Sequence, residues 1–435
     1  LVNSGADVES VTYVFTPFIE GGTNIGDCHN GVVETVTIYV NPTPEMSVSV
    51  ADTIICNDEN IVFITDSLVS TLGEVRYTVD VSYSGNVTGA IANGTAHDIG
   101  SMTDHLINTG DEVESVTYVF RPFIEGGTNS GDCFNGIAET VTIYVNPTPE
   151  MSVTVADTLL CNDEDVNFVL DSLVSTRGTL RYTLDVTTSS GDVTSTLPTT
   201  SIRDISNFVD HLVNTGDDDE YVTYVFTPFI EGGTNSGDCH NGIIETVTIY
   251  VNPTPDIEVI APDSVICNDE DVAFNIQNLN PGVQGEWKYN LVVDYGAYIS
   301  GDGIGGEYDG SDTNLTDHLV NHDTAVHGVS YHFTPRITPS DNGLDCGSGR
   351  DTTIWIWVNP SPEIRVNILP DTVICNEDPI NLFIRNPNYN VRGEWLYNLT
   401  VDYGTYITGD NIGGEYDATD VVLTDQLTNH DTMYH

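Results

Sequence analysis

The stretch ETVTIYVNPTPEMSV, residues 34–48, is the first of four related copies along the chain. It recurs unchanged at 139–153, as ETVTIYVNPTPDIEV at 245–259, and as TTIWIWVNPSPEIRV at 352–366. Its first half alternates β-branched and aromatic residues with polar ones, which predicts a strand. The two prolines fix φ and lack backbone donors, so they predict the end of that strand and a short, stiff linker to the next one.

Other motifs recur at the same interval, which is the size of a domain. The linkers begin at Asn41, Asn146, Asn252 and Asn359, so each step is about 106 residues long. This interval is too long for a helical or leucine-rich solenoid repeat. We therefore expect the end of one domain at 1–41, whole domains at 42–146, 147–252 and 253–359, and the start of another at 360–435. The last two are of a second type, and both chain ends fall inside a repeat, so we expect an internal segment of a longer protein.

Strands predominate within each repeat, separated by clusters of Gly, Asn, Asp and Pro. This pattern predicts an all-β fold of tandem antiparallel β-sandwiches of about seven strands each. The stretches SMTDHLIN (101–108) and NFVDHLVN (207–214) fit either a helical turn or a strand. One position in four aligned strands is predicted to lie in the core; it is occupied by Val75, Leu180, Trp287 and Trp395.

The charge of the chain is strongly negative. There are 66 acidic and 11 basic residues, which gives a net charge of −55. Such a field repels nucleic acid and anionic lipid, so we exclude both as partners. The acidic residues are spread along the chain, as in a solvated coat on folded units. No apolar run reaches the about 20 residues that span a bilayer, so we expect no direct membrane insertion of this segment.

The cysteines follow the repeat at two per domain: Cys28, Cys56, Cys133, Cys161, Cys239, Cys267, Cys346 and Cys375. An even, periodic set in a strand-rich chain predicts disulfides and an oxidising exterior. Three regular schemes are open: within a domain (Cys56–Cys133, Cys161–Cys239, Cys267–Cys346), across a linker (Cys28–Cys56), or between neighbouring domains (Cys56–Cys239). We expect the within-domain scheme, because the stretch EGGTNSGDC is long enough, at about 3.3 Å per residue, to fold back along the domain.

No catalytic motif of the GxSxG, HExxH or P-loop kind is present, so we expect no enzyme activity. The acidic turns that follow the first cysteine of each repeat gather hard oxygen donors, which suit calcium. An acidic turn closed by its own hydrogen bonds explains the same residues, and EF-hand spacing is absent. The candidate calcium ligands are Asp58, Glu59, Asp163, Glu164, Asp269 and Glu270.

The succession TYVFTPFIEGG, DC-x-NG, ETVTIYVNPTP and ADTIICNDE resembles the PKD-like and immunoglobulin-like repeats of giant Bacteroidetes cell-surface proteins. The nearest comparison is with gliding-motility adhesins of the SprB type, and the resemblance covers every repeat. It implies export by the type IX secretion system and display as a long extracellular filament that is anchored outside this segment and attaches to surfaces. It also implies O-glycosylation at Asp-Ser/Thr motifs, with candidate hydroxyls on Thr53, Ser67, Thr158, Ser172, Ser264, Thr324, Thr352, Thr372 and Thr432.

These observations favour an internal segment of an extracellular filament or adhesin, which gives reach and surface attachment and serves gliding motility. Its partners would be neighbouring repeats or other copies, together with surfaces or polysaccharides. One alternative is a calcium-stiffened stalk that spaces a distal domain. Another is a polysaccharide-binding repeat, which requires a row of exposed aromatic side chains; the candidates are Tyr295, Tyr298, Tyr308, Tyr403, Tyr406 and Tyr416.

Overall fold

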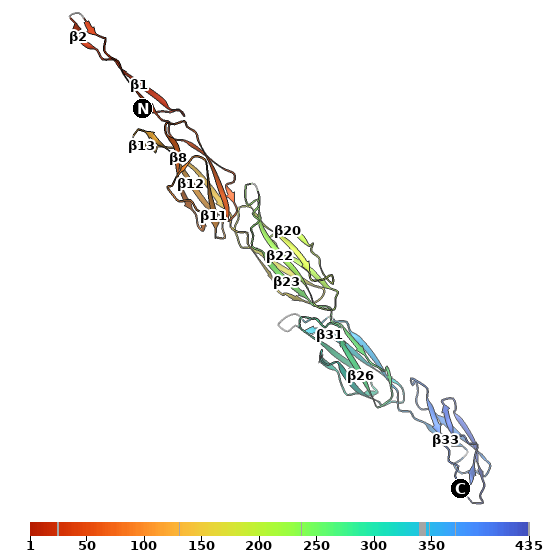
Figure 1. Ribbon diagram of the computed structural model, residues 1–435. Coiled ribbons are helices and arrows are strands. Elements are labelled where there is room, and N and C mark those ends of the chain that lie inside the picture. Colours follow the sequence, from red (N-terminus) through yellow and green to blue (C-terminus); the bar gives the residue numbers. More distant parts are fainter. Residues whose placement is uncertain are drawn as a thin grey trace.

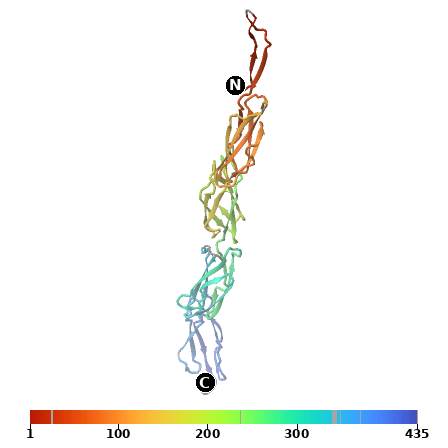
Figure 2. The same ribbon diagram turned by 90° about the vertical axis from the view of Figure 1, so that its left-hand side faces the viewer.

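The computed structural model describes residues 1–23, 26–129, 131–235, 237–338, 345–347, 349–369 and 371–433, and this part of the chain contains strands but no helix. Three two-sheet β-sandwiches follow one another, preceded by a β-hairpin and followed by an open group of strands. Figures 1 and 2 show these units end to end as a rod, with the hairpin at one end and the C terminus at the other. The expected all-β fold of tandem sandwiches is confirmed.

The first sandwich faces a sheet of order β5-β7-β11-β9 against one of order β10-β8-β12-β14-β6, with β13 paired to β12. Its strands are β5 (Met46–Val50), β6 (Ile54–Ile55), β7 (Glu59–Ser67), β8 (Glu74–Tyr83), β9 (Val87–Thr88), β10 (Ala96–Asp98), β11 (Ser101–Asn108), β12 (Glu114–Thr128), β13 (Gly131–Cys133) and β14 (Glu139–Val145).

The second and third sandwiches repeat this topology. The second contains β15 (Met151–Val155), β16 (Leu159–Leu160), β17 (Glu164–Ser172), β18 (Thr179–Thr188), β19 (Val193–Ser195), β20 (Thr200–Asp204), β21 (Phe208–Asn214), β22 (Glu220–Glu231) and β23 (Glu245–Val251). The third contains β24 (Ile257–Ile260), β25 (Val265–Ile266), β26 (Glu270–Asn278), β27 (Glu286–Asp294), β28 (Ile299–Ser300), β29 (Gly306–Asp309), β30 (Asn314–Asn321), β31 (His327–Thr338) and β32 (Thr352–Val358).

The flanking units are smaller. The hairpin unit has β1 (Glu9–Phe15) paired with β4 (Glu34–Val40), and β2 (Ile19–Thr23) paired with β3 (Gly26–Cys28). The open C-terminal group, which we call the fourth unit, contains β33 (Arg365–Leu369), β34 (Pro379–Arg385), β35 (Leu396–Leu399), β36 (Ile407–Thr408), β37 (Gly414–Asp417), β38 (Val422–Gln426) and β39 (Thr428–Asn429).

Two details of the strands differ from, or add to, the sequence-based expectation. The second and third sandwiches each contain nine strands among the residues described, rather than about seven, because several strands are only two to five residues long. One short strand in each sandwich, β6, β16 or β25, pairs in parallel with the last strand, so the sheets are not purely antiparallel. The ambiguous stretch at 101–108 forms strand β11, and 208–214 of the second stretch form β21. Both strands alternate buried and more exposed residues.

The pairing of the last two long strands determines where each cysteine lies. In the second sandwich Glu220 pairs with Val251, so β22 begins where β23 ends. We call the end at Val251, beside the following linker, the downstream end, and the opposite end the upstream end. Because β16 pairs in parallel with the last residues of β23, Cys161 lies at the downstream end. Cys239 pairs with Ile230 near the end of β22, and therefore lies at the upstream end.

Each core is built around aromatic rings and contains one buried carboxylate. In the first sandwich Tyr118, Phe63 and Phe120 are fully buried and in ring contact. The Tyr118 hydroxyl donates a hydrogen bond of 2.6 Å to Asp104, whose side chain is also buried. Burial, and then the contact with this carboxylate, raise the pKa of Tyr118 far above its usual range, so the hydroxyl stays protonated.

Candidate functional site: the stapled joints

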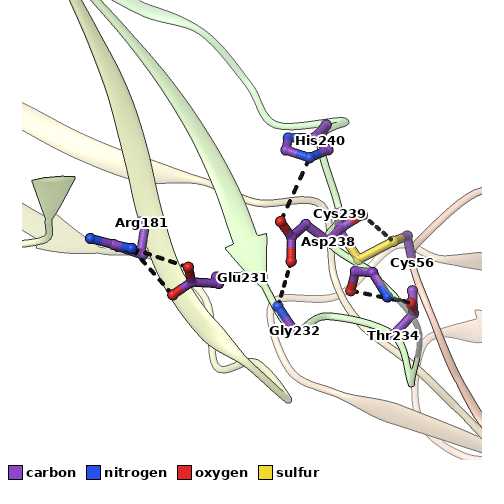
Figure 3. A network of polar contacts seen from close by, with 9 residues as sticks. Cys56, Arg181, Glu231, Gly232, Thr234, Asp238, Cys239 and His240 are labelled. Carbon is purple, nitrogen blue, oxygen red and sulfur yellow. Dashed lines mark hydrogen bonds and ion pairs between the residues drawn. A yellow bond between two sulfur atoms is a disulfide. The ribbon is translucent and has the colours of Figure 1, made fainter. Parts of the chain in front are cut away.

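Two disulfides connect successive sandwiches. Cys56 of the first sandwich is bonded to Cys239 of the second, and Cys161 of the second to Cys346 of the third, with Cα–Cα distances of 5.5 and 5.4 Å. We call these two bonds the staples; Figure 3 shows the one at Cys56 and Cys239. Each staple links the downstream end of one sandwich to the upstream end of the next, beside the linker that already joins them.

The within-domain pairing expected from the sequence is wrong for the bonded cysteines. Two cysteines of one sandwich lie at opposite ends of it, as Cys161 and Cys239 do. The stretch before Cys239 does not fold back along the domain, because Ile230 and Cys239 exchange backbone hydrogen bonds of 3.0 and 2.9 Å. The neighbour-to-neighbour scheme, one of the three left open by the sequence, is the one that forms.

The loop that presents the second cysteine is fixed within each repeat. Asp238 accepts a hydrogen bond of 2.8 Å from the backbone N–H of Gly232, as Figure 3 shows. Gly232 has a φ of 65°, a conformation that favours glycine. The same contact occurs between Gly126 and Asp132 at 2.8 Å, although Cys133 is free. The loop therefore forms without the disulfide.

The turn that presents the first cysteine is fixed by the acidic residues after it. The Glu59 carboxylate accepts the N–H of Cys56 at 3.2 Å, and Glu164 and Glu270 repeat this contact in the next two sandwiches. Asp58 adopts a φ of 64°, a left-handed conformation that Asp tolerates better than most residues. Equivalent positive values occur at Asp163 and Asp269.

These aspartates lie beside histidines from the neighbouring strand. His105 lies 2.9 Å from Asp58, and His211 and His318 lie 3.0 and 3.1 Å from Asp163 and Asp269. Hydrogen bonds, first to Asp165 and then to Asp163, raise the pKa of His211. Among the residues described, no group of three or more His, Cys, Asp or Glu is arranged to hold a metal ion. Calcium binding by the six acidic candidates stays a prediction, which melting with and without chelator tests.

Each staple is buried against a nonpolar side chain of the downstream sandwich. Cys56 and Cys239 are 4% and 1% exposed and pack with Ile230 and Leu180. Cys161 and Cys346 belong to the same cluster as Trp287. Two of the four residues predicted as core, Leu180 and Trp287, therefore lie beside a staple. Of the four, only Trp287 is buried, and the other three are half-buried.

The linker asparagine binds the downstream sandwich. Asn146 is fully buried and donates hydrogen bonds to the carbonyls of Gly233 (2.6 Å) and Arg177 (3.0 Å). The side-chain carbonyl oxygen of Asn146 accepts a hydrogen bond of 2.7 Å from the backbone N–H of Arg177. Asn41, Asn252 and Asn359 make the corresponding two-way contact with Leu72, Gln284 and Arg392. The linker is therefore part of the packed structure rather than a free spacer.

A second asparagine, next to the staple, binds the linker from the upstream side. The Asn57 side chain donates a hydrogen bond of 2.8 Å to the Thr148 hydroxyl of the linker. The backbone carbonyl of Asn57 accepts a hydrogen bond of 3.0 Å from the side chain of Asn241 in the next sandwich. Asn162 and Asn268 make the linker contact at the next two joints. Arg177 of the second sandwich also lies 3.5 Å above the ring of Tyr144 of the first. Each of these contacts restricts rotation between two sandwiches.

Four cysteines are free: Cys28, Cys133, Cys267 and Cys375. Of the nine candidate glycosylation hydroxyls, seven are exposed and two, Thr324 and Thr352, are half-buried. Thr53 lies at the first joint, where its hydroxyl accepts a hydrogen bond of 3.2 Å from Asn235. Modification of these residues stays a prediction.

The six tyrosines named for polysaccharide binding do not form an exposed row. Tyr298 and Tyr406 are about half exposed, at 51% and 49%. The hydroxyls of the other four point to partners within their own unit: Tyr295 to Asp317, Tyr403 to Asp425, and Tyr308 and Tyr416 to the backbone carbonyls of Ile304 and Ile412. These four side chains help to form the fold.

Sequence reasoning missed the asparagines of the joint. In the sequence, Asn41 and its counterparts mark the start of each linker, and Asn57 belongs to the acidic turn after Cys56. The signal was their recurrence in every repeat beside proline and cysteine. A buried asparagine that bridges two units is a tertiary contact, which spacing along one chain does not identify.

A family model described as PKD-like domain matches residues 53–149. Among solved structures, the chain is similar to the Escherichia coli adhesin FdeC (14% identity, 73% of this chain and 99% of that chain, TM-score 0.26). It is also similar to three N-terminal domains of the outer capsid protein Hoc of bacteriophage RB49 (10%, 73% and 99%, TM-score 0.30) and to an ICAM-5 D1–D4 ectodomain fragment (9%, 89% and 91%, TM-score 0.30). The search of curated proteins gave no match. In the part of the chain that is described, no helix is long and apolar enough to cross a membrane.

Proposed function

We propose that this chain is a segment of a long extracellular filament, in which repeated sandwiches provide reach. The observation that carries the proposal is the pair of staples, because each one ties a sandwich to the next at a joint that the linker already closes. Two covalent connections at one joint suit a stiff spacer. The role is structural and adhesive rather than catalytic, and the repeats at 42–146, 147–252 and 253–359 are its units.

The staples also support the location. Disulfides persist in oxidising surroundings, and the net charge of −55 would keep long exposed filaments apart in solution. We propose that the chain is exported and anchored to the cell surface through a part outside this segment. The resemblance to Bacteroidetes surface repeats extends this proposal to type IX secretion, O-glycosylation and surface attachment during gliding.

The stiffness of the joints is the testable centre of this proposal. Electron microscopy of the oxidised full chain is expected to show straight rods, with a narrow spread of angles at the two stapled joints. The double substitution Cys56→Ser with Cys239→Ser is expected to broaden the spread of angles at the first joint only. The third joint, around Asn359, has no staple and is the internal control. An equal spread of angles at the stapled and third joints would contradict the proposal.

Attachment is tested separately. The purified chain is applied to glass and to polysaccharide-coated beads under flow, and its retention is compared with that of an unrelated sandwich protein of similar charge. Retention above that control supports the adhesive role. Retention equal to the control would remove that role and leave a passive spacer.

A further inference from the structure

We propose that the two staples form a covalent bypass, which carries tension past the cores of the first and third sandwiches and limits how far the rod can be stretched. This inference deepens the proposed filament function, because a filament that attaches to surfaces is pulled along its length. It depends on the connectivity of the disulfides and on the ends of the sandwiches at which they lie.

The first staple shortens the covalent path through two sandwiches. A force that enters at Asn41 reaches Cys56, crosses to Cys239, and leaves through β23 to Asn252. The staple closes a loop with a sequence separation of 183 residues, which includes most of the first two sandwiches. When this staple is the only one present and its bond holds, that loop adds no length to the stretched chain.

The second staple overlaps the first. Its loop has a separation of 185 residues and begins at Cys161, inside the loop of the first staple. Two segments therefore cross the second sandwich from joint to joint: 147–161, which leads into the second staple, and 239–252, which leads out of the first. They lie side by side, because β16 pairs in parallel with the end of β23. Each is only about 15 residues long and has little slack.

The overlap gives a quantitative signature. With one staple, 183 or 185 residues are excluded from the stretched path. With both staples, the shortest covalent path from Cys56 to Cys346 crosses the first staple to Cys239, runs back along the chain to Cys161, and crosses the second staple. The segment between Cys161 and Cys239 belongs to both loops. Because this shared segment must still be stretched, the excluded length is about 210 residues, little more than one staple excludes alone. Separate loops, as in the within-domain scheme, would instead add.

The test is single-molecule pulling of the full chain through handles at its two ends. The four free cysteines are replaced by serine in every variant, so that thiols do not exchange. Four variants are compared. The first keeps both staples, the second carries Cys56→Ser with Cys239→Ser, and the third carries Cys161→Ser with Cys346→Ser. The last carries all four of these substitutions and has no staple. Total contour length is measured without reductant and compared with that of the last variant.

At about 3.4 Å per residue, each single staple is expected to shorten the contour by roughly 600 Å and both together by roughly 700 Å. Added reductant restores the full length in every variant. With both staples intact, shortening by twice the single-staple value would overturn the inference, as would equal lengths in all variants. These outcomes report connectivity and bear on the bypass alone; the filament proposal is tested by joint angles and attachment.

Discussion

At the residue scale, asparagine performs the connecting role at each joint. Its side chain has a donor and an acceptor, so Asn146 binds a backbone N–H and a carbonyl of the same loop at once. A third hydrogen bond, donated to the carbonyl of Gly233, extends the contact to the loop that carries Cys239. One buried side chain thus holds two loops of the downstream sandwich in the positions that the staple requires.

Replacement of Asn146 by alanine is expected to destabilise the chain by about 1–3 kcal/mol, because it leaves buried backbone groups without partners. The measurement is urea unfolding of the oxidised full chain. Asn167→Ala is the matched control, since Asn167 is exposed on β17, and it is expected to change stability by less than about 0.5 kcal/mol. Equal effects of the two substitutions would contradict a bridging role for Asn146.

The buried tyrosines predict a loss of stability at high pH. Tyr118, Tyr224 and Tyr331 donate to buried carboxylates, and burial followed by these contacts raises the pKa of each far above its usual value near 10. A group whose pKa is higher in the folded state stabilises the fold fully below its unfolded pKa, and this contribution falls as pH rises further. Stability is therefore expected to hold up to about pH 10 and to decline above it.

This prediction is checked by urea unfolding between pH 8 and 12, with the free cysteines replaced by serine. The triple variant with phenylalanine at Tyr118, Tyr224 and Tyr331 is expected to show a shallower decline. Tyr250→Phe, at an exposed position, serves as the control and should follow the parent chain. A decline of the same steepness in the triple variant would show that other groups cause it.

At the element scale, each repeat forms by itself the turn that presents its first cysteine and the loop that presents its second cysteine. The Gly126 to Asp132 contact matches the Gly232 to Asp238 contact in length, whether or not the cysteine is bonded. At the third joint Cys267 and Trp395 line a cavity of about 250 Å³, with Asn359 and Pro360. Trp395 has the position that Trp287 has beside the second staple.

Cys267 is therefore expected to form a staple when a complete fourth repeat is present. Residues 328–359 can be added after His435 in register, because His435 aligns with His327. In this chimera Cys267 should bond to the added copy of Cys346, and Cys375 should stay free. Non-reducing peptide mapping checks the pairing, with the original chain as control. A bond between Cys375 and the added cysteine would contradict the neighbour rule.

At the scale of the whole molecule, charge and shape act together. The net charge of −55 is distributed along a rod, so two rods repel one another over most of their length at low salt. The range of that repulsion falls from about 30 Å at 0.01 M ionic strength to about 8 Å at 0.15 M. This charge favours separate rods over bundles of rods.

Light scattering of the oxidised full chain tests this expectation. The second virial coefficient should be strongly positive at 0.01 M salt and should fall several-fold at 0.15 M, because screening shortens the repulsion. A net-neutral sandwich protein serves as the control and should change little. A negative coefficient at low salt would indicate attraction between rods despite their charge.

The sequence by itself determined the repeat, the strand-rich sandwich, the short proline linkers and the periodic cysteines. These depend on local preferences and on spacing, which alternation, proline and a period of about 106 residues make visible. Only the tertiary structure decided which cysteines meet and which asparagines hold the joints. Cys161 and Cys239 belong to one repeat, yet the antiparallel course of β22 and β23 separates them to opposite ends of the sandwich. A disulfide needs two cysteines within a few ångströms, and that proximity arises here only between neighbouring sandwiches packed end to end.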